Sequence, residues 1–376
     1  MSEWQELTLG KITEPVKNTY LPKSEEQLAY IGLEHIEQET LRLTGVGTSS
    51  DVTSNKFKFE SNDVLFGKLR PYFRKVYKPK FPGICSTDIW VFRAKKGFVQ
   101  DFLFYFLASW DFVDTANSGE GGTRMPRADW NFLKTTNWLV PCEEEQKAIA
   151  SVLSSLDDKI DLLHRQNTTL ERMAETLFRQ WFVEEAQENW EERPLSSIAN
   201  FLNGLACQKF PPTDAINKLP VLKIKELSSG ISENSDWATT NVKPEYIVEN
   251  GDVIFAWSAS LMVKVWDGEK CVLNQHLFKV TSLQFPKWFY LHWCKYHLDE
   301  FISISSSHAT TMGHIKRGDL DMAMVKVPKP EELALMAEQM TPLLEKQIIN
   351  AKQIKTLKKL RDNLLPKLMS GEVRVI

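Results

Sequence analysis

Hydrophobic residues recur at alternating intervals of four and three positions between residues 143 and 187. The positions that follow this spacing are Ile149, Leu153, Leu156, Ile160, Leu163, Asn167, Leu170, Ala174, Leu177 and Trp181. No Gly or Pro interrupts the segment, and Glu143, Glu144 and Glu145 stand where a helix dipole favours negative charge. The pattern predicts one long helix of coiled-coil type over residues 143–187, with Asn167 as its polar seam residue.

The same spacing returns between residues 331 and 370, with more polar members. Its seam is Leu343, Gln347, Asn350, Ile354, Leu357, Arg361 and Leu364. We expect Pro342 to kink this helix or to mark a restart capped by Thr341, because proline lacks the N–H that a helix interior uses. A seam this polar needs the first helix as its partner.

We expect the two helices to pair antiparallel, because each is joined to a globular region by a short connection. If Asn167 faces Asn350, then Leu163 meets Ile354. Such a matched polar layer would fix the register. A helical hairpin without a matched polar layer is the alternative.

Outside the helices, short β-type runs alternate with turn signals in two similar layouts. In residues 1–142 we expect strands near 63–67 and 87–92 and a helix over 100–116. In residues 188–330 we expect strands near 252–257, 264–266 and 276–280 and a helix over 286–302. Both halves are therefore predicted to be α+β domains.

Short motifs of the first half return in the second at a nearly constant offset. Trp4 opens the first half as Trp190 opens the second, and residues 62–66 (Asn-Asp-Val-Leu-Phe) return at 251–255 as Gly-Asp-Val-Ile-Phe. A duplicated chain can place two similar domains about a pseudo-twofold axis, and duplex DNA has twofold axes of its own. The predicted fold class is α+β, with two pseudo-twofold-related α+β domains separated by an antiparallel coiled coil.

Composition narrows the class of protein. The chain of 376 residues is 43% hydrophobic and 25% charged, which is typical of a globular protein. No apolar run reaches membrane-spanning length and the start is no signal peptide, so we expect a cytoplasmic protein that does not enter the membrane. Five scattered cysteines without a CxxC pair indicate reduced thiols and argue against structural zinc.

The net charge of −3 is unevenly distributed, because the acidic excess lies in residues 143–189 and the globular halves are close to neutral. Neutral domains would attract DNA only weakly without regard to sequence, so a DNA-binding role would need help from a partner.

Motifs for catalysis are absent. There is no P-loop, no Asn/Asp-Pro-Pro-aromatic motif of amino-methyltransferases and no H-E-x-x-H metal motif. The run Asp157-Asp158-Lys159 has the residue types of a nuclease, but a solvated helix face explains it. The glycine-rich residues 118–123 lie in a polar loop and not at a strand-to-helix turn. The sequence therefore predicts a protein that is not an enzyme, with no catalytic residue, no metal site and no cofactor of its own.

The sequence features typical of nucleic-acid binding are stronger than those for catalysis, because basic and aromatic residues are interspersed between Lys56 and Lys80. Basic groups contact phosphates, and Arg can form a bidentate pair with guanine. The candidate DNA-binding residues of the first half are Lys68, Arg70, Tyr72, Arg74, Lys75, Ser86, Thr87, Arg124 and Arg127. The alternative is that the aromatic residues form a core and the lysines are merely solvated.

The second half carries different side chains at the corresponding positions. Its candidates, which could read base edges by hydrogen bonding, are Trp257, Ser258, Ser260, Lys264, Asn274, Gln275, His276, Thr311, His314 and Lys316. The loops at 122–127 and 310–317 could equally be ordinary connections. A shared scaffold with different surface chemistry predicts two different half-sites.

The chain resembles the specificity (S) subunits of type I restriction–modification systems over essentially its whole length. The runs that carry the resemblance are residues 63–75, 85–89, 123–126, 140–149 and 364–372. Residues 257–264 lack the Lys-Leu-Arg-Pro pattern of residues 68–71, so residue roles in the second half do not follow from the resemblance.

The resemblance implies two target-recognition domains, residues 1–142 and 188–330, each reading one half of a bipartite double-stranded DNA site. Residues 143–187 and 331–370, followed by a short C-terminal tail, would form spacer helices that set the gap and dock methyltransferase subunits, expected to be two. Restriction (motor) subunits would join the full complex. S-adenosylmethionine, ATP and Mg²⁺ would then belong to the partner subunits.

A helix seam from Ile149 to Trp181 would span about 48 Å at 1.5 Å per residue. Along DNA this corresponds to roughly 14 base pairs at about 3.4 Å each. The main alternative function is a non-catalytic scaffold that binds proteins through its coiled coil and never reads DNA. A self-contained restriction–modification enzyme is a further alternative, against which the absent methyltransferase motif argues.

Overall fold

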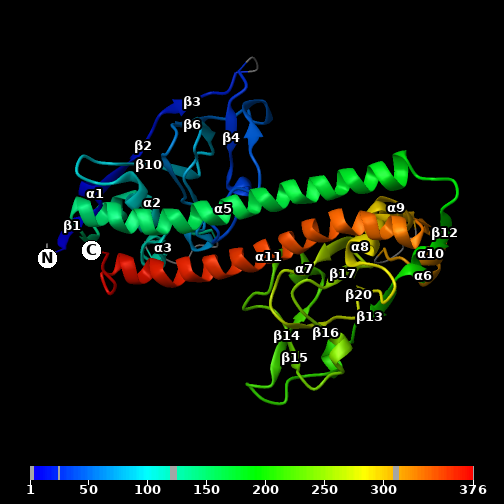
Figure 1. Cartoon of the computed structure of the whole chain (residues 1–376). Helices are drawn as coiled ribbons and strands as arrows, with labels where there is room; N and C mark the ends of the chain where they lie inside the picture. The colour runs from blue at the N-terminus through cyan, green and yellow to red at the C-terminus, as the bar shows by residue number, and fades with distance from the viewer. Residues whose placement is uncertain (1–3, 24–25, 119–124, 308–312, 376) are drawn as a thin grey trace. The chain divides into compact units, whose positions relative to one another are not determined.

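The computed structural model describes residues 4–23, 26–118, 125–307 and 313–375, and the chain divides into two compact units. Unit 1 comprises Met1–Ile160 and Thr356–Ile376, and unit 2 comprises Asp161–Lys355. Each unit combines β-sheets, short helices and part of both long helices (Figure 1). The fold class is α+β with two long helices packed together, as the sequence predicts.

The described residues of unit 1 form three sheets. Its strands are β1 (Gln5–Thr8), β2 (Thr13–Val16), β3 (Thr19–Tyr20), β4 (Ala29–Ile31), β5 (Gly47–Thr48), β6 (Lys56–Phe59), β7 (Val64–Gly67), β8 (Val76–Tyr77), β9 (Gly83–Cys85), β10 (Ile89–Ala94) and β11 (Asn137–Val140). The strand orders are β1-β11, β2-β10-β7-β8 and β3-β6-β9-β4-β5. Strand β7 lies between β10 and β8 in the second sheet. Its four residues are all buried because both faces of the sheet are covered, with Val64 and Phe66 in one core cluster and Leu65 in another.

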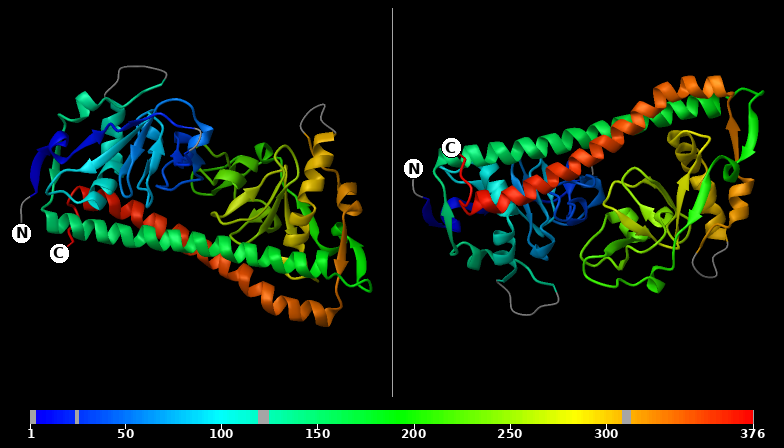
Figure 2. Two further views of the ribbon diagram at one scale, coloured as in Figure 1. Left: turned by 90° about the horizontal axis from the view of Figure 1, so that it is seen from above. Right: turned by 60° about the horizontal axis from the view of Figure 1, so that its bottom comes forward.

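The short helices of unit 1 are α1 (Leu9–Ile12), η1 (Leu33–His35), η2 (Ser49–Asp51), η3 (Pro71–Phe73), α2 (Gln100–Ala108), α3 (Trp110–Ser118) and α4 (Trp130–Leu133). Helices α2 and α3 share a buried core with β7 and β10, in which Phe66, Phe92 and Phe112 are fully buried. Both termini of the described chain lie at the same end of this unit in both views of Figure 2.

Unit 2 repeats the plan. Its strands are β12 (Glu191–Pro194), β13 (Asn200–Asn203), β14 (Lys218–Leu222), β15 (Trp237–Thr239), β16 (Ile247–Val248), β17 (Val253–Ala256), β18 (Met262–Val265), β19 (Cys271–Leu273), β20 (Leu277–Thr281) and β21 (Met324–Val327). Its short helices are α6 (Leu195–Ile198), η5 (Cys207–Lys209), α7 (Ile224–Ser229), η6 (Pro244–Tyr246), α8 (Lys287–Tyr296), α9 (Leu298–Ser307) and α10 (Arg317–Met322).

The two units share one topology. The order β13-β20-β17-β18 matches β2-β10-β7-β8, and β12-β21 matches β1-β11. Each unit also has one parallel strand pair, β4 with β9 and β14 with β19. The indole N–H of Trp4 donates to Glu145 (3.1 Å), and that of Trp190 donates to Glu332 (2.8 Å). The repeat in the sequence is therefore a repeat of structure.

The long helices are α5 (Glu143–Arg179), which ends in the π-helical turn η4 (Gln180–Glu184), and α11 (Pro330–Met369). In unit 1, Ile149 and Leu153 of α5 share a core with Leu365 and Leu368 of α11. In unit 2, the later α5 residues Ala174 and Phe178 share a core with the earlier α11 residues Met340 and Leu344. The helices are thus antiparallel, as expected.

A polar layer between the helices fixes their register in unit 2. Asn350 has no exposed surface, and its amide donates to Oδ1 of Asn167 at 2.9 Å. The Asn167 amide in turn donates to the carbonyl of Gln347 at 3.1 Å. These hydrogen bonds confirm that the two asparagines face each other.

Pro342 does not divide the second helix. Helix α11 continues through it, so the expected restart with Thr341 as cap is wrong. The neighbouring Met340 and Leu344 are buried in the core of unit 2. Their burial, at about 25 cal/mol per Å² of apolar surface, offsets the hydrogen bond that proline removes.

Each helix expected in the globular halves is two helices. The segment 100–116 breaks at Ser109, whose hydroxyl accepts from the Phe112 N–H (3.3 Å) and donates to the Phe106 carbonyl (2.7 Å). Ser109 thus caps α3, which lets the chain turn after α2. The segment 286–302 is also divided into two helices, with α8 ending before His297 and α9 beginning after it.

In the part of the chain that the structure describes, no helix is both long and apolar enough to cross a membrane.

Candidate nucleic-acid interface

Three separate segments of unit 1 meet beyond the end of β7. The backbone N–H of Lys68 donates to the Asp88 carbonyl (2.9 Å), and that of Arg70 donates to the Pro126 carbonyl (2.8 Å). The Ala128 N–H donates back to the Lys68 carbonyl (2.9 Å). Because β7 is buried, this framework places the loop 68–75, the turn 86–88 and the segment 125–127 on a rigid base.

Five candidates from the sequence lie on this framework and are partly or fully exposed. They are Lys68, Arg70, Tyr72, Thr87 and Arg127, which we name the first platform. Arg70 has φ +52°, and its guanidinium lies 5.9 Å from the centre of the Phe73 ring. Arg127 Nε lies 3.5 Å from Oδ1 of Asp88. The first platform thus combines cations with one exposed aromatic face.

Arg74 does not belong to this surface. It is 3% exposed, its Nε donates to the Ala108 carbonyl (2.6 Å) and its Nη1 donates to the Glu39 carbonyl (3.2 Å). Burial lowers the pKa of Arg74 to about 10. A guanidinium held in this way by backbone carbonyls is not available to DNA, so the proposal of Arg74 as a contact residue needs correction.

Two further candidates of the first half are engaged within the unit. The Lys75 ammonium donates to the Leu33 carbonyl, and burial lowers the pKa of Lys75. The Ser86 hydroxyl accepts from the Asp88 N–H at 3.2 Å. Arg124 lies outside the described residues.

The basic run between Lys56 and Lys80 is not one surface. Lys56 is buried and donates to the Ser54 carbonyl (2.9 Å), while Lys78 donates to Asp101. Lys80 pairs with Asp158 of α5 at 3.0 Å. Lys56 and Lys78 are thus engaged within the unit and are not merely solvated, whereas Lys80 is exposed and pairs with α5.

Unit 2 builds the same framework from different residues. The Trp257 N–H donates to the His276 carbonyl (3.4 Å), and the Ala259 N–H donates to the Gly313 carbonyl (2.8 Å). The Ile315 N–H donates back to the Trp257 carbonyl (3.1 Å). Ala259 has φ +56°, which matches Arg70. Trp257, Ala259 and His276 are therefore the structural equivalents of Lys68, Arg70 and Asp88.

The exposed or half-buried candidates on this second framework are Trp257, Ser260, Gln275, His276 and His314, which we name the second platform. The Gln275 amide nitrogen lies 3.3 Å from Nε2 of His276. The Trp257 indole N–H donates to Oδ1 of Asn203 (3.1 Å), and its ring centre lies 6.3 Å from that of His314. This platform offers amide, imidazole and indole groups in place of cations.

The remaining candidates of the second half lie elsewhere. Ser258 and Asn274 are buried, with the Ser258 hydroxyl 3.1 Å from Nδ1 of His276. Lys264 lies on β18, pairs with Asp267 (3.5 Å) and lines a cavity of about 230 Å³ beside the long helices. Lys316 is exposed next to the platform, and its backbone N–H donates to Asp319. Thr311 lies outside the described residues.

Sequence reasoning missed two residues of these frameworks. Asp88 pairs with Arg127, and Asn203 holds the Trp257 indole. The repeat itself could have indicated Asp88, since it stands where the second half has His276. Asn203 has no such signal, because its role depends on β13 lying next to β20.

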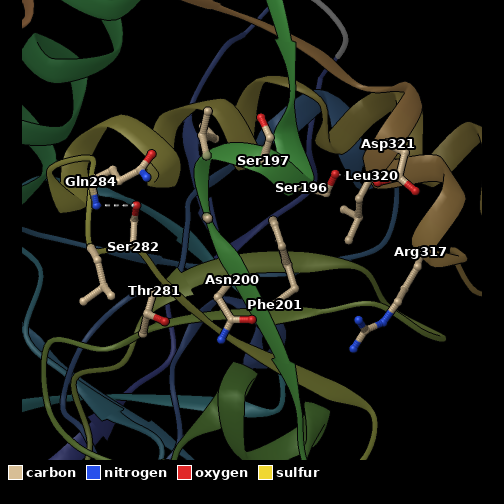
Figure 3. Close-up of a pocket in the computed structure, with 13 residues that line it drawn as sticks. Ser196, Ser197, Asn200, Phe201, Thr281, Ser282, Gln284, Arg317, Leu320 and Asp321 are labelled. Carbon is tan, nitrogen blue, oxygen red and sulfur yellow. Dashed lines mark hydrogen bonds between the residues drawn. The ribbon is translucent and has the colours of Figure 1, made fainter. Parts of the chain in front are cut away.

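A surface hollow of about 790 Å³ also lies in unit 2, between α6, β13 and α10 (Figure 3). Its lining includes Asn200, Thr281 and Arg317, and the Ser196 hydroxyl donates to Asp321 on its wall. None of the DNA-binding candidates lines it. Within the described ranges, no group of three or more His, Cys, Asp or Glu is placed to hold a metal ion.

The two α+β units have one topology, and each presents its own set of side chains on the same loop framework. These features define a protein with two similar recognition domains. A family model, "Type I restriction modification DNA specificity domain", matches residues 1–172 and again residues 187–359. The chain belongs to the family of type I restriction–modification specificity subunits, and it is the non-catalytic DNA-specificity subunit of such a system.

Similar proteins agree with this assignment. The chain is 29% identical over 308 residues to the type I restriction enzyme MjaIX specificity subunit of Methanocaldococcus jannaschii, covering 75% of this chain and 71% of that protein. It is 18% identical to the HindI specificity subunit of Haemophilus influenzae, covering 99% and 100%. The crystal structure of the type I S subunit from M. genitalium has the same fold, with a TM-score of 0.58, 15% identity and coverage of 97% and 96%.

Proposed function

We propose that each platform reads one half of a bipartite site in double-stranded DNA, with residues 1–142 and 188–330 acting as target-recognition domains. The observation that supports this proposal is the shared framework with different side chains. Equivalent backbone hydrogen bonds hold Arg70 and Ala259 in the same left-handed conformation, yet one carries a guanidinium and the other a methyl group.

The chemistry of the two platforms favours different bases. Arg70 and Arg127 carry guanidinium groups, which form bidentate pairs with guanine or contact phosphates. Gln275 carries an amide, which suits adenine, and His276 and His314 add imidazole groups beside it. We therefore expect the two half-sites to differ in sequence.

In this proposal, α5 and α11 set the gap between the half-sites and dock methyltransferase subunits, two of them by the symmetry of the repeat. An apolar groove of about 430 Å³ on the helices in unit 2 supports the docking role; it is lined by Leu162, Arg165, Gln166, Thr169, Leu170 and Lys346. On the same helix, Met173 is 48% exposed. Unpartnered apolar side chains of this kind are typical of a protein-binding surface.

Restriction subunits would join the methyltransferase subunits in the full complex. S-adenosylmethionine, ATP and Mg²⁺ would be bound by those partner subunits, and the complex would act on DNA in the cytoplasm. This chain would supply the choice of sequence and the spacing.

The test is selection of bound duplexes from a randomised library by the chain assembled with its methyltransferase subunits. Arg70→Ala should weaken base preference in one half-site by about 1–3 kcal/mol, the value of a bidentate contact. Gln275→Ala should do the same in the other half-site only. Because unit 2 already carries alanine at the position of Arg70, the first variant keeps a backbone that the fold accepts.

A complex with no base preference at all would favour a protein-binding scaffold instead. If both variants weakened the same half-site, the assignment of one half-site to each unit would be wrong.

A further inference from the structure

A buried polar network in unit 1 joins the long helices to the loop that carries the first platform. Arg361 of α11 is 2% exposed, although it occupies a seam position where an apolar residue is usual. Its Nη1 donates to Oδ1 of Asp157 on α5 (2.9 Å) and to the Thr40 carbonyl (3.4 Å). The hydroxyl of Tyr105 on α2 donates to the other oxygen of Asp157 (2.8 Å).

Arg74 forms the second arm of the network. Arg74 ends the short helical turn that follows Arg70, and its Nη1 donates to the Glu39 carbonyl (3.2 Å). The guanidinium groups of Arg74 and Arg361 therefore bind two consecutive carbonyls of the loop 37–42, one from the platform side and one from the helix side. Hydrogen bonds thus connect the loop 37–42 to the helix pair through Arg361 and to the platform loop through Arg74.

The backbone around the network is held in an uncommon conformation. Among described non-glycine residues, positive φ values occur at six positions, and four of them belong here: Glu39 (+64°), Leu41 (+61°), Arg70 (+52°) and Arg74 (+46°). Left-handed conformations of non-glycine residues persist only where the surroundings determine them strongly. Framework hydrogen bonds hold Arg70 as they hold Ala259 in unit 2. The two arginines of the network bind the carbonyls of Glu39 and Thr40, in the loop where Glu39 and Leu41 adopt this conformation.

The repeat shows that packing alone does not require this network. Asp157 stands 12 residues after Glu145, and the residue 12 after the equivalent Glu332 is Leu344. Counted in the same way, Arg361 corresponds to Ala174, and both Leu344 and Ala174 lie in the apolar core of unit 2. Replacing a buried ion pair by well-packed apolar residues is often neutral or stabilising, so stability alone does not account for the charged pair of unit 1.

We propose that Arg361 and Arg74 are positioning residues that fix the first platform relative to the spacer helices, so that base discrimination in one half-site depends on a residue of the coiled coil. The inference rests on the proposed function, because it assumes that the first platform reads DNA. Arg361, a polar seam residue, would thus have a role in unit 1 that has no counterpart in unit 2, where Ala174 and Leu344 occupy the equivalent positions.

The experiment compares Arg361→Met with the natural chain, each assembled with methyltransferase subunits, by selection from a randomised duplex library. We expect discrimination in the half-site of the first platform, identified through Arg70→Ala, to fall about tenfold, as when a good base contact is lost. Discrimination in the other half-site should stay within about twofold, which is the ordinary effect of a remote substitution. Arg361→Lys should restore part of the loss, because lysine keeps the charge beside Asp157.

The matched control is Asn350→Leu, which removes another fully buried polar residue from the same seam. Asn350 contacts Asn167 and Gln166 of unit 2 and none of the network, so both half-sites should keep their discrimination. If Arg361→Met does not fold, the double variant Asp157→Leu with Arg361→Ala, which copies the pair of unit 2, takes its place.

Hydrogen exchange of the free full-length chain gives a second measurement that needs no DNA. The N–H groups of Phe73, Arg74 and Val76, which donate within the loop, should exchange faster in Arg361→Met. Unchanged exchange together with unchanged discrimination overturns the proposal, as does an equal loss in both half-sites. If the natural complex prefers no sequence, the proposed function fails, and the exchange result alone decides whether the network positions the loop.

Discussion

At the scale of single residues, the side chains at equivalent positions of the two platforms differ, while the backbone conformation is the same. Arg70 and Ala259 share a left-handed conformation and equivalent hydrogen bonds, so the side chain at this position is free to change without refolding the loop. The sequence predicted Lys68 and Arg70 because they are cationic and stand among aromatic residues, and Arg127 because it lies in a polar, basic loop before the first long helix. It could not separate them from Arg74, since burial of a cation depends on carbonyls that are distant in the sequence.

The structural equivalence of Arg70 and Ala259 predicts that an arginine at position 259 would gain a contact with DNA. Ala259→Arg should place a guanidinium on the second platform as Arg70 does on the first, and each added phosphate contact steepens the salt dependence of log K by about 0.9. DNA binding of the assembled complex across a salt series measures this slope. Ile216→Arg is the control, because Ile216 is 88% exposed and is not a residue of the second platform. An equal slope for both variants would contradict a DNA-facing second platform.

His292 predicts how stability depends on pH. Burial lowers its pKa to about 4, against about 6.5 when unfolded, so the unfolded chain binds the proton more tightly. Stability present above pH 6.5 should therefore be lost as the pH falls from 6.5 to 4, by at most about 3 kcal/mol. Urea unfolding at pH 7.5 and pH 5 measures the loss. His292→Gln should flatten the dependence, and a variant with the natural pH profile would rule out His292 as its source.

At the scale of elements, periodicity predicted the long helices well because their seams are regular over many turns. The sequence also predicted β7, β17 and their neighbours, whose apolar runs are unambiguous. It erred where tertiary packing opposes a local signal. Pro342 stays inside α11 because its neighbours are buried, and Ser109 divides one apolar stretch into α2 and α3 by capping.

The asparagine layer predicts a coupled response in stability. Asn350→Leu should cost about 1–3 kcal/mol, because it leaves the buried side of Asn167 without its donor. Replacing Asn167 by leucine as well should recover most of that loss, since apolar seam residues then face each other. Denaturant unfolding of the four chains in a double-mutant cycle checks this. Additive losses would mean that the two side chains do not interact.

At the scale of the whole molecule, the duplication was the most informative part of the sequence, because it predicted two domains and two helices together. The reading surfaces could be predicted only in part. The basic run from Lys56 to Lys80 is continuous in sequence, yet its members point into the core, toward α5 and onto the first platform. Conversely, each platform gathers segments that stand far apart in the chain, and only the fold brings them together.

The spacer role predicts a change in gap when both helices are shortened together. Removing Leu163–Thr169 from α5 and Ile348–Ile354 from α11 takes one heptad from each, which shortens the pair by about 10 Å. The preferred gap should then decrease by about 3 base pairs. Methylation of duplexes with graded gaps measures the preference. Replacing the same heptads with other heptads of equal length should keep the original gap, and a shortened chain that also keeps it would contradict the spacer role.

In the proposed function, each target-recognition domain reads its own half-site. The sharpest test of this proposal is a domain exchange. In a chain whose residues 1–142 are replaced by a second copy of residues 188–330, assembled with methyltransferase subunits, selection from a randomised duplex library should yield the same short sequence twice. The two copies should be inverted and separated by the natural gap. A single block of preferred bases, or two blocks identical to those of the natural chain, would contradict the account.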